Sequence, residues 1–181
     1  MGRPVRVAIA GLGNRGRDNY ARAAKFHPDK MEIAAVADID PKKVELVAEE
    51  YHLPKEACFS SAEEMLEREK LADVMIIATQ DRQHVGHAVA ALRKGYHLLL
   101  EKPVSPEIEE CRRLAETAGN CGRKVVVCHV LRYTPIYQKV KELLDEGVIG
   151  DVVSIMASEN VGWYHQAHSF VRGNWANSKE T

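Results

Sequence analysis

An apolar run that leads directly into closely spaced glycines limits, more than any other feature, how this chain can fold. Residues 5–10 read VRVAIA and residues 11–16 read GLGNRG. Val5, Val7 and Ile9 give the run the pattern of a buried strand, and the residues after Gly16 can wind a helix. The side chains expected on the inner face of that helix are Tyr20, Ala23, Ala24 and Phe26. The sequence therefore predicts a strand, a tight turn and a helix in direct succession.

The glycines have the spacing of a phosphate-binding turn. Gly11 allows the turn itself, Gly13 lets the backbone approach a pyrophosphate, and Gly16 lets the helix pack closely against the strand. Asn14 and Arg15 lie between them, and the arginine offers a charged donor to a phosphate. The free N–H groups at the helix N-terminus also favour an anion. An ordinary glycine-rich turn has the same letters, so the interpretation depends on the second strand and on the residue at its end.

An acidic residue lies at the distance that a dinucleotide site requires. Residues 31–37 have the pattern of a second strand, and Asp38 lies 22 residues beyond Gly16. In such folds this acid binds a ribose hydroxyl of the cofactor, and its charge repels a 2′-phosphate. The sequence thus predicts NAD as the cofactor, with NADP less favoured. The positive charges of Lys42 and Lys43, in the next helix, weaken the preference for NAD over NADP.

Composition and charge exclude several other classes of protein. The chain has 181 residues, 45% hydrophobic and 28% charged, which suits one full domain and part of another. A formal net charge of -1 gives no general attraction to nucleic acid or to an acidic membrane surface. Because no apolar stretch approaches a membrane span and no signal-peptide pattern precedes the first strand, we expect a cytoplasmic protein.

The cysteines do not indicate a metal site or a disulfide framework. Cys58, Cys111, Cys121 and Cys128 show no C-x-x-C spacing, and no tight group of cysteine and histidine suggests zinc. We therefore expect reduced, mostly buried thiols and no bound metal.

Strand and helix patterns alternate along residues 1–130. Further strands are expected at residues 57–59, 73–79, 96–100 and 124–130. This alternation predicts an α/β fold with a doubly wound parallel sheet of the Rossmann type. Asp40 before Pro41, and Ser105 before Pro106, each look like an N-cap followed by proline at the first helical position. The side chains expected to be buried by the helix after Ser105 are Ile108, Cys111, Leu114, Ala115 and Ala118.

The pattern changes in residues 131–181, which we interpret as the start of a second, incomplete α/β domain. Ile136, Val140 and Leu143 mark an amphipathic helix that ends at Gly147. Residues 153–157 alternate between apolar and polar side chains, as in a half-buried strand. Residues 162–181 have no clear period and are predicted to be loop.

The motifs together resemble one known family. They are the strand and glycine loop, the acid in Val36-Ala37-Asp38, Ala78-Thr79 followed by His84, and Glu101-Lys102-Pro103 after the apolar residues 98–100. In this order they are similar to the Gfo/Idh/MocA family of glucose-fructose oxidoreductase and inositol dehydrogenase relatives. The similarity continues through Arg132-Tyr133 with Pro135 and through residues 147–150. The resemblance implies a Rossmann domain followed by an α/β domain with a large, mainly antiparallel sheet.

The resemblance also implies a reaction, in which hydride passes between C4 of the nicotinamide and a hydroxyl-bearing carbon of a sugar, cyclitol or related diol. It places Lys102 near that carbon, as a donor to the reacting oxygen. Independently, Lys102 follows a parallel strand at its carboxyl end, where ligands of open α/β sheets bind. Without the resemblance it reads as a surface lysine. Glu101 supports either the charge of the lysine or the bound cofactor, and in the family the bond before Pro103 can be cis.

Other candidates depend more heavily on context. Thr79 and Gln80 follow a strand where the nicotinamide or its ribose would pass, and His84 matches a family position but is as often structural. Arg132 fits a substrate pocket or a structural ion pair equally well. His165 and His168 have the spacing of one helical face, but Gly162 and the polar surroundings favour a loop and argue against a metal pair there.

One part of the family pattern is absent. The family usually supplies a histidine, often with a nearby aspartate, from its second domain as general acid/base, and no such His-Asp pair follows Lys102. The expected motif falls close to or beyond Thr181, so we expect either a piece of a longer enzyme, inactive by itself and homo-oligomeric when complete, or a natural truncation. His165 and His168 are minor substitutes. The alternative to an enzyme is a catalytically silent dinucleotide sensor or regulatory module.

Overall fold

The computed structural model describes residues 2–173 and 175–177, which form two compact units that divide between Cys128 and His129. The first unit contains the glycine turn and all the strands of the described part of the chain. The second contains helices and extended segments. Each unit is described by itself.

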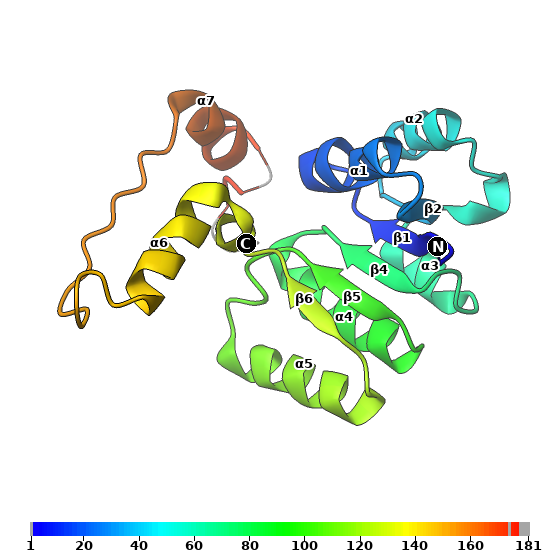
Figure 1. The fold of residues 1–181 in the computed structure, drawn as a ribbon. Helices are drawn as coiled ribbons and strands as arrows, with labels where there is room; N and C mark the ends of the chain where they lie inside the picture. Colours follow the sequence, from blue (N-terminus) through cyan, green and yellow to red (C-terminus); the bar gives the residue numbers. More distant parts are fainter. Residues whose placement is uncertain (1, 174, 178–181) are drawn as a thin grey trace. The chain divides into compact units, whose positions relative to one another are not determined.

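The first unit is built on a parallel sheet, as the alternating pattern predicts (Figure 1). Its six strands in the described residues lie in the order β3-β2-β1-β4-β5-β6, and each pairs in parallel with its neighbours. They are β1 (Val5–Ala10), β2 (Met31–Ala37), β3 (Cys58–Phe59), β4 (Val74–Ile77), β5 (His97–Leu100) and β6 (Val125–Val127). Strand order reverses between β1 and β4, where such sheets open a ligand crevice. The predicted Rossmann fold is confirmed.

Helices cover both faces of this sheet (Figure 1). They are the π-helix η1 (Asn14–Ala21), α1 (Arg22–Phe26), α2 (Pro41–Tyr51), α3 (Ala62–Glu67), α4 (His84–Arg93) and α5 (Ile108–Cys121), with short 3₁₀ turns η2 (Lys55–Ala57) and η3 (Asp81–Gln83). Successive side chains of a strand point to opposite faces. Accordingly, Val7 and Ile9 of β1 pack in one core with Val47 of α2. Ala8 and Ala10 pack in the other, which contains residues of α3, α4 and α5.

The two predicted helix starts have different outcomes. Asp40 is the N-cap of α2, where its carboxylate accepts a hydrogen bond from the Lys42 N–H at 3.0 Å. Ser105 is not an N-cap, because its hydroxyl accepts from the Glu107 N–H at 3.0 Å and α5 begins only at Ile108. This local turn competes with a helix start.

The late start of α5 also changes which of its side chains are buried. The prediction that Ile108 and Ala115 are buried is wrong, since Ile108 is 66% exposed and Ala115 is also exposed. Leu114 is buried, whereas Cys111 and Ala118 are partly buried. The helix covers the side of the sheet near the edge strand β6, so only a narrow stripe of it is in contact with the core.

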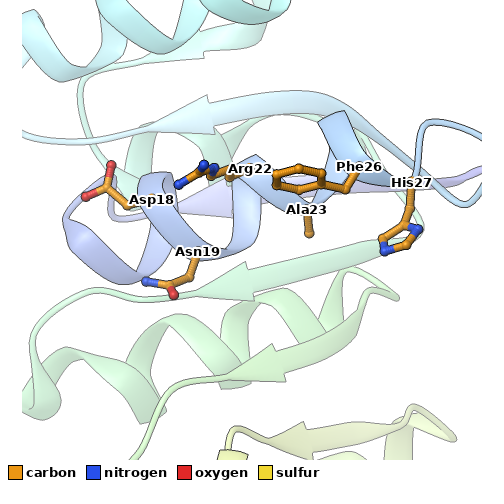
Figure 2. Close-up of a pocket in the computed structure, with 6 residues that line it drawn as sticks. All are labelled: Asp18, Asn19, Arg22, Ala23, Phe26 and His27. Atoms are coloured by element: carbon orange, nitrogen blue, oxygen red, sulfur yellow. The ribbon is translucent and has the colours of Figure 1, made fainter.

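The inner face of the first helix also differs at its end. Ala24 is buried, but Phe26, predicted to point inward, is 65% exposed and lies under the guanidinium of Arg22. The i→i+5 pattern of η1 adds a residue to the turn, so a side chain placed by the 3.6 period is rotated away from the sheet. Arg22, Phe26 and His27 border a depression of about 310 Å³ along η1 and α1, and Figure 2 shows how these side chains lie.

The second unit contains one of the predicted elements and lacks another. Helix α6 (Pro135–Asp145) follows the 3₁₀ turn η4 (Val130–Tyr133), as the amphipathic pattern indicates. Residues 153–157 form no strand, and Val153 is 96% exposed. A strand requires a partner for its backbone N–H and C=O groups, and the described residues give this segment none.

The predicted loop at residues 162–181 is wrong for its first half. Here α7 (Trp163–His165) continues into the π-helix η5 (Gln166–Val171), and the rings of Tyr164 and His168 lie 4.1 Å apart. Stacking of side chains along the helix stabilises a segment without an apolar period. Residues 174 and 178–181 lie outside the described part of the chain.

None of the helices in the described residues combines the length and apolar character needed to cross a bilayer. The cysteines among these residues are free, and Cys128 is the buried one.

A substitution at Gly16 tests the packing of η1 on β1. We expect Gly16→Ala to lower the free energy of unfolding by about 1–3 kcal/mol, because a Cβ there would lie 1.7 Å from the Gly11 carbonyl oxygen. The measurement is urea denaturation followed by circular dichroism. Gly119→Ala in α5 is the matched control, since nothing lies within 4 Å of its Cβ and alanine favours a helix. Equal effects of the two variants would contradict the argument.

Candidate functional site

The glycine turn has the geometry of a phosphate cradle. Gly11 has φ +89°, and a Cβ there would lie 2.4 Å from the Ala78 carbonyl oxygen, so only glycine fits. Gly13, in contrast, has no heavy atom within 4 Å of where its Cβ would be. The N-terminus of η1 has neither a side-chain cap nor an acidic residue in its first turn. Open space beside uncapped N–H groups fits a dinucleotide pyrophosphate.

Asp38 follows β2 and anchors the glycine turn. Its carboxylate is 9% exposed and accepts hydrogen bonds from the Leu12 N–H at 2.6 Å and the Asp40 N–H at 2.9 Å. Lys43 Nζ lies 3.7 Å from one carboxylate oxygen. A carboxylate has about four acceptor sites, so Asp38 keeps capacity for a ribose hydroxyl. The sequence indicated the ribose role but not the anchoring one.

Glu101 connects the motif after β5 to the glycine turn. Its side chain is 7% exposed and accepts hydrogen bonds from the Tyr20 hydroxyl and, at 3.1 Å, from the Lys102 N–H. Arg15 Nε lies 3.7 Å from the same carboxylate. One buried acid therefore contacts residues of η1 and of the motif that contains Lys102. Arg15, predicted to meet a phosphate, is half-exposed beside this acid.

Burial affects the groups next to Glu101. It raises the pKa of the Tyr20 hydroxyl, and hydrogen bonds with Cys128 and Glu101 raise it further. Burial also raises the pKa of the Cys128 thiol. Both groups therefore stay protonated at neutral pH, and Tyr20 remains a hydrogen-bond donor to the acid.

Lys102 lies at the carboxyl edge of the sheet, directly after β5. Its side chain is exposed and forms no ion pair with the described residues. Because it is exposed, the ammonium is free to meet a ligand at the edge where Asp38 and the glycine turn also lie. The bond between Lys102 and Pro103 is cis.

His84 joins the two loops that follow β4 and β5. The ring is 1% exposed, with Nδ1 2.7 Å from the Pro103 carbonyl oxygen and Nε2 3.1 Å from the Thr79 carbonyl oxygen. With both nitrogens directed at main-chain oxygens, the ring positions the Lys102 turn rather than presenting a nitrogen to a ligand. Gln80 is the N-cap of η3, and its N–H donates to the Gln83 side chain at 3.3 Å.

Three side chains that the sequence did not single out as functional also take part. Tyr20 was placed on an inner helix face without a polar role, and His87 and Glu63 were not considered. His87 is 7% exposed, and its Nδ1 lies 3.1 Å from Thr79 Oγ1. A histidine one helical turn after His84 on α4 was the available signal for it.

The remaining candidates belong to the second unit. Arg132 lies in η4, and His165 and His168 lie in the helical segment after residue 162. His165 Nδ1 lies 3.3 Å from the Ser169 hydroxyl. Within the described residues no three histidine, cysteine or acidic side chains are grouped to hold a metal.

Comparison with known proteins places this site in a family. Residues 5–129 match the family model described as an oxidoreductase family with an NAD-binding Rossmann fold. The chain belongs to the Gfo/Idh/MocA family. Its first unit is the NAD-binding Rossmann domain of that family, which supports NAD as the cofactor.

Individual members of the Gfo/Idh/MocA family differ in their reactions. The chain is 31% identical over 150 residues to inositol 2-dehydrogenase 3 of Saccharopolyspora erythraea, a match that covers 81% of this chain and 42% of that protein. It is 27% identical over 177 residues to 2,7-anhydro-N-acetylneuraminate hydratase of Escherichia coli, covering 97% and 44%.

A solved structure shows the same architecture. The WlbA dehydrogenase of Chromobacterium violaceum, in complex with NADH and UDP-GlcNAcA, has a TM-score of 0.75 and 25% identity, over 83% of this chain and 42% of that one. The chain thus spans about two fifths of the length of the relatives that it matches.

The hydroxyl of Tyr20 gives a test of the Glu101 cluster. We expect Tyr20→Phe to lower the free energy of unfolding by about 1.5–3 kcal/mol, because it removes a donor to a buried carboxylate. Tyr51→Phe is the control, since the Tyr51 ring is partly buried but its hydroxyl has no hydrogen bond among the described residues. The measurement is chemical denaturation of both variants. A loss as large in Tyr51→Phe would show that the Glu101 contact is not its cause.

Two substitutions should change cofactor preference in opposite directions. Asp38→Ala removes the charge that repels a 2′-phosphate, so the ratio of NADP to NAD dissociation constants should fall. Lys43→Gln leaves that charge uncompensated, so the ratio should rise by about two- to fivefold. Calorimetric titration measures both ratios. Lys42→Gln is the control, because no ion pair joins Lys42 to Asp38 in the described chain. An unchanged ratio in Asp38→Ala would remove Asp38 from this role.

Proposed function

We propose that this chain is the cofactor-binding part of an NAD-dependent oxidoreductase that moves hydride between nicotinamide and a hydroxyl-bearing carbon of a sugar or cyclitol. The observation that carries the proposal is the position of Lys102. Its ammonium is exposed at the carboxyl edge of the sheet, on a turn that Glu101 and His84 connect to the glycine loop and to β4. An inositol dehydrogenase among the relatives supports the substrate class.

The first unit would bind the cofactor through three of its loops, which follow β1, β2 and β4. The N–H groups after Gly13 would contact the pyrophosphate, with Asn14 and Arg15 beside it. Asp38 would accept a hydrogen bond from the adenosine ribose while it holds the Leu12 N–H. Thr79, Gln80 and the loop after β4 would border the nicotinamide half. When bound, NAD supplies the acceptor and donor of hydride.

Lys102 would act on the oxygen of the reacting carbon. A cationic donor directed at that oxygen stabilises the negative charge that develops when the hydroxyl proton departs. The Lys102 N–H is held by Glu101, and the Pro103 carbonyl oxygen lies 2.7 Å from the His84 ring, so the backbone of the turn is fixed at two points. We assign transfer of the hydroxyl proton to a residue outside the first unit, as the family resemblance implies.

The test compares two lysines at opposite edges of the sheet, in the protein expressed from its complete reading frame. Lys102→Met should lower turnover by about 100-fold or more while the NADH dissociation constant changes little. Lys124→Met is the control, since Lys124 directly precedes β6 at the amino edge. The measurement is a screen of sugars and cyclitols that follows both NADH and product.

Product must be measured because a hydratase is among the relatives, and hydration produces no net NADH. Equal turnover of Lys102→Met and the unmodified protein would overturn the proposed role. NADH binding without turnover on any substrate would favour a dinucleotide sensor instead.

A further inference from the structure

A buried histidine outside the proposed cofactor contacts connects a solvent-facing acid to the loop after β4. His87 Nε2 lies 2.8 Å from Glu63 Oε1, and His87 Nδ1 lies 3.1 Å from Thr79 Oγ1. The three side chains come from α3, α4 and the end of β4, and Glu63 precedes Thr79 by 16 positions in the sequence. The imidazole side chain is 8% exposed, whereas that of Glu63 is 65% exposed.

The order of partners determines which ring nitrogen carries the proton. A carboxylate only accepts hydrogen bonds, so the nitrogen that faces Glu63 must be an N–H. The hydrogen bond from His87 lowers the pKa of Glu63, which keeps Glu63 ionised at neutral pH. A neutral imidazole protonated at Nε2 has a lone pair at Nδ1. In its neutral form, the His87 ring is therefore an acceptor on the side that faces Thr79.

The hydrogen-bonding role of the Thr79 hydroxyl follows from that of the His87 ring. A hydroxyl has one hydrogen and two acceptor lone pairs. If the hydrogen is donated to His87 Nδ1, the remaining polar capacity of Thr79 Oγ1 is that of an acceptor. A ligand at this point must then offer an N–H or O–H.

Thr79 is situated where such a ligand would pass. It follows β4 at the reversal of strand order, and a Cβ on Gly11 would lie 2.9 Å from its main-chain nitrogen. Its carbonyl oxygen lies 3.1 Å from the His84 ring, which also contacts Pro103. Thr79 is thus between the glycine turn and the loop that contains Lys102.

We propose that Glu63 and His87 are positioning residues that set Thr79 as a hydrogen-bond acceptor for a donor group on the nicotinamide half of the cofactor. This inference rests on the proposed function, because it requires the dinucleotide to bind along the carboxyl edge. Two donors share that chemistry, the hydroxyl groups of the second ribose and the carboxamide N–H₂ of the nicotinamide.

The first experiment examines the ring without any ligand. Nitrogen NMR of the 181-residue chain, labelled at histidine, should show the His87 tautomer protonated at Nε2. Glu63→Ala should change this signal, because the partner that selects the tautomer is lost. Glu67→Ala is the control, since Glu67 lines the same groove between α3 and α4 but forms no hydrogen bond with His87. A ring protonated at Nδ1, or at both nitrogens, would overturn the inference.

The second experiment measures NADH binding by calorimetry. Thr79→Val and His87→Leu should each weaken binding by about three- to tenfold, and Thr79→Ser should restore it. In the double variant the two losses should not add, because His87 acts through Thr79. Additive losses would mean that His87 affects only packing. If His87→Leu does not fold, the NMR signals of His87 in the unmodified chain and in Glu63→Ala still test the proposed tautomer.

Two further ligands separate the possible donors. ADP-ribose keeps the second ribose and lacks nicotinamide, whereas the 3-acetylpyridine analogue of NAD lacks the carboxamide N–H₂. If the ribose is the partner, Thr79→Val should weaken both; if the carboxamide is the partner, it should weaken neither. Failure of the unmodified chain to bind NADH would refute the proposed function. If NADH binds but the His87 ring is protonated at Nδ1 or at both nitrogens, only the role of Glu63 and His87 is refuted.

Discussion

The close approach of Gly16 to the Gly11 carbonyl oxygen is the constraint on which the rest of the first unit depends. It allows η1 to lie directly against β1, and this places Tyr20 next to Glu101. A side chain at Gly16 would displace the helix from the strand, and one at Gly11 would collide with the Ala78 carbonyl oxygen after β4. The position of the acid after β5 is therefore linked to a backbone contact that lies some 85 residues earlier in the chain.

The carboxyl edge of the sheet combines rigid support with exposed reactive groups. Glu101, His84 and His87 are nearly buried, and each binds a neighbouring loop or helix rather than open solvent. Lys102 and the turn around Gly13 are exposed. This division is what pre-organised sites require, because the buried groups hold the geometry while the exposed groups stay available to the ligand.

The sequence predicted this fold, and it indicated most residues of the candidate site, because both depend on local patterns. The doubly wound parallel sheet follows from the alternating elements, and Asp38 is indicated by its spacing from Gly16. Contacts between distant segments were not accessible in the same way. The link from Tyr20 to Glu101 spans 81 residues, and Ile108 is exposed where α5 starts late, after the turn that Ser105 forms. Residues 153–157 have the alternation of a strand, but pairing depends on a partner that the pattern does not supply.

The double use of Asp38 has a consequence for how this protein can evolve. In the proposed site one side chain would discriminate between cofactors, and the same side chain holds the glycine turn through the Leu12 N–H. A single mutation that removes its charge would also release the Leu12 N–H, so a change toward NADP carries a folding penalty from the first step. Lineages that make this change would first need a substitute anchor for the turn. Asp38 should for that reason vary only together with its neighbours, even where the substrate changes freely.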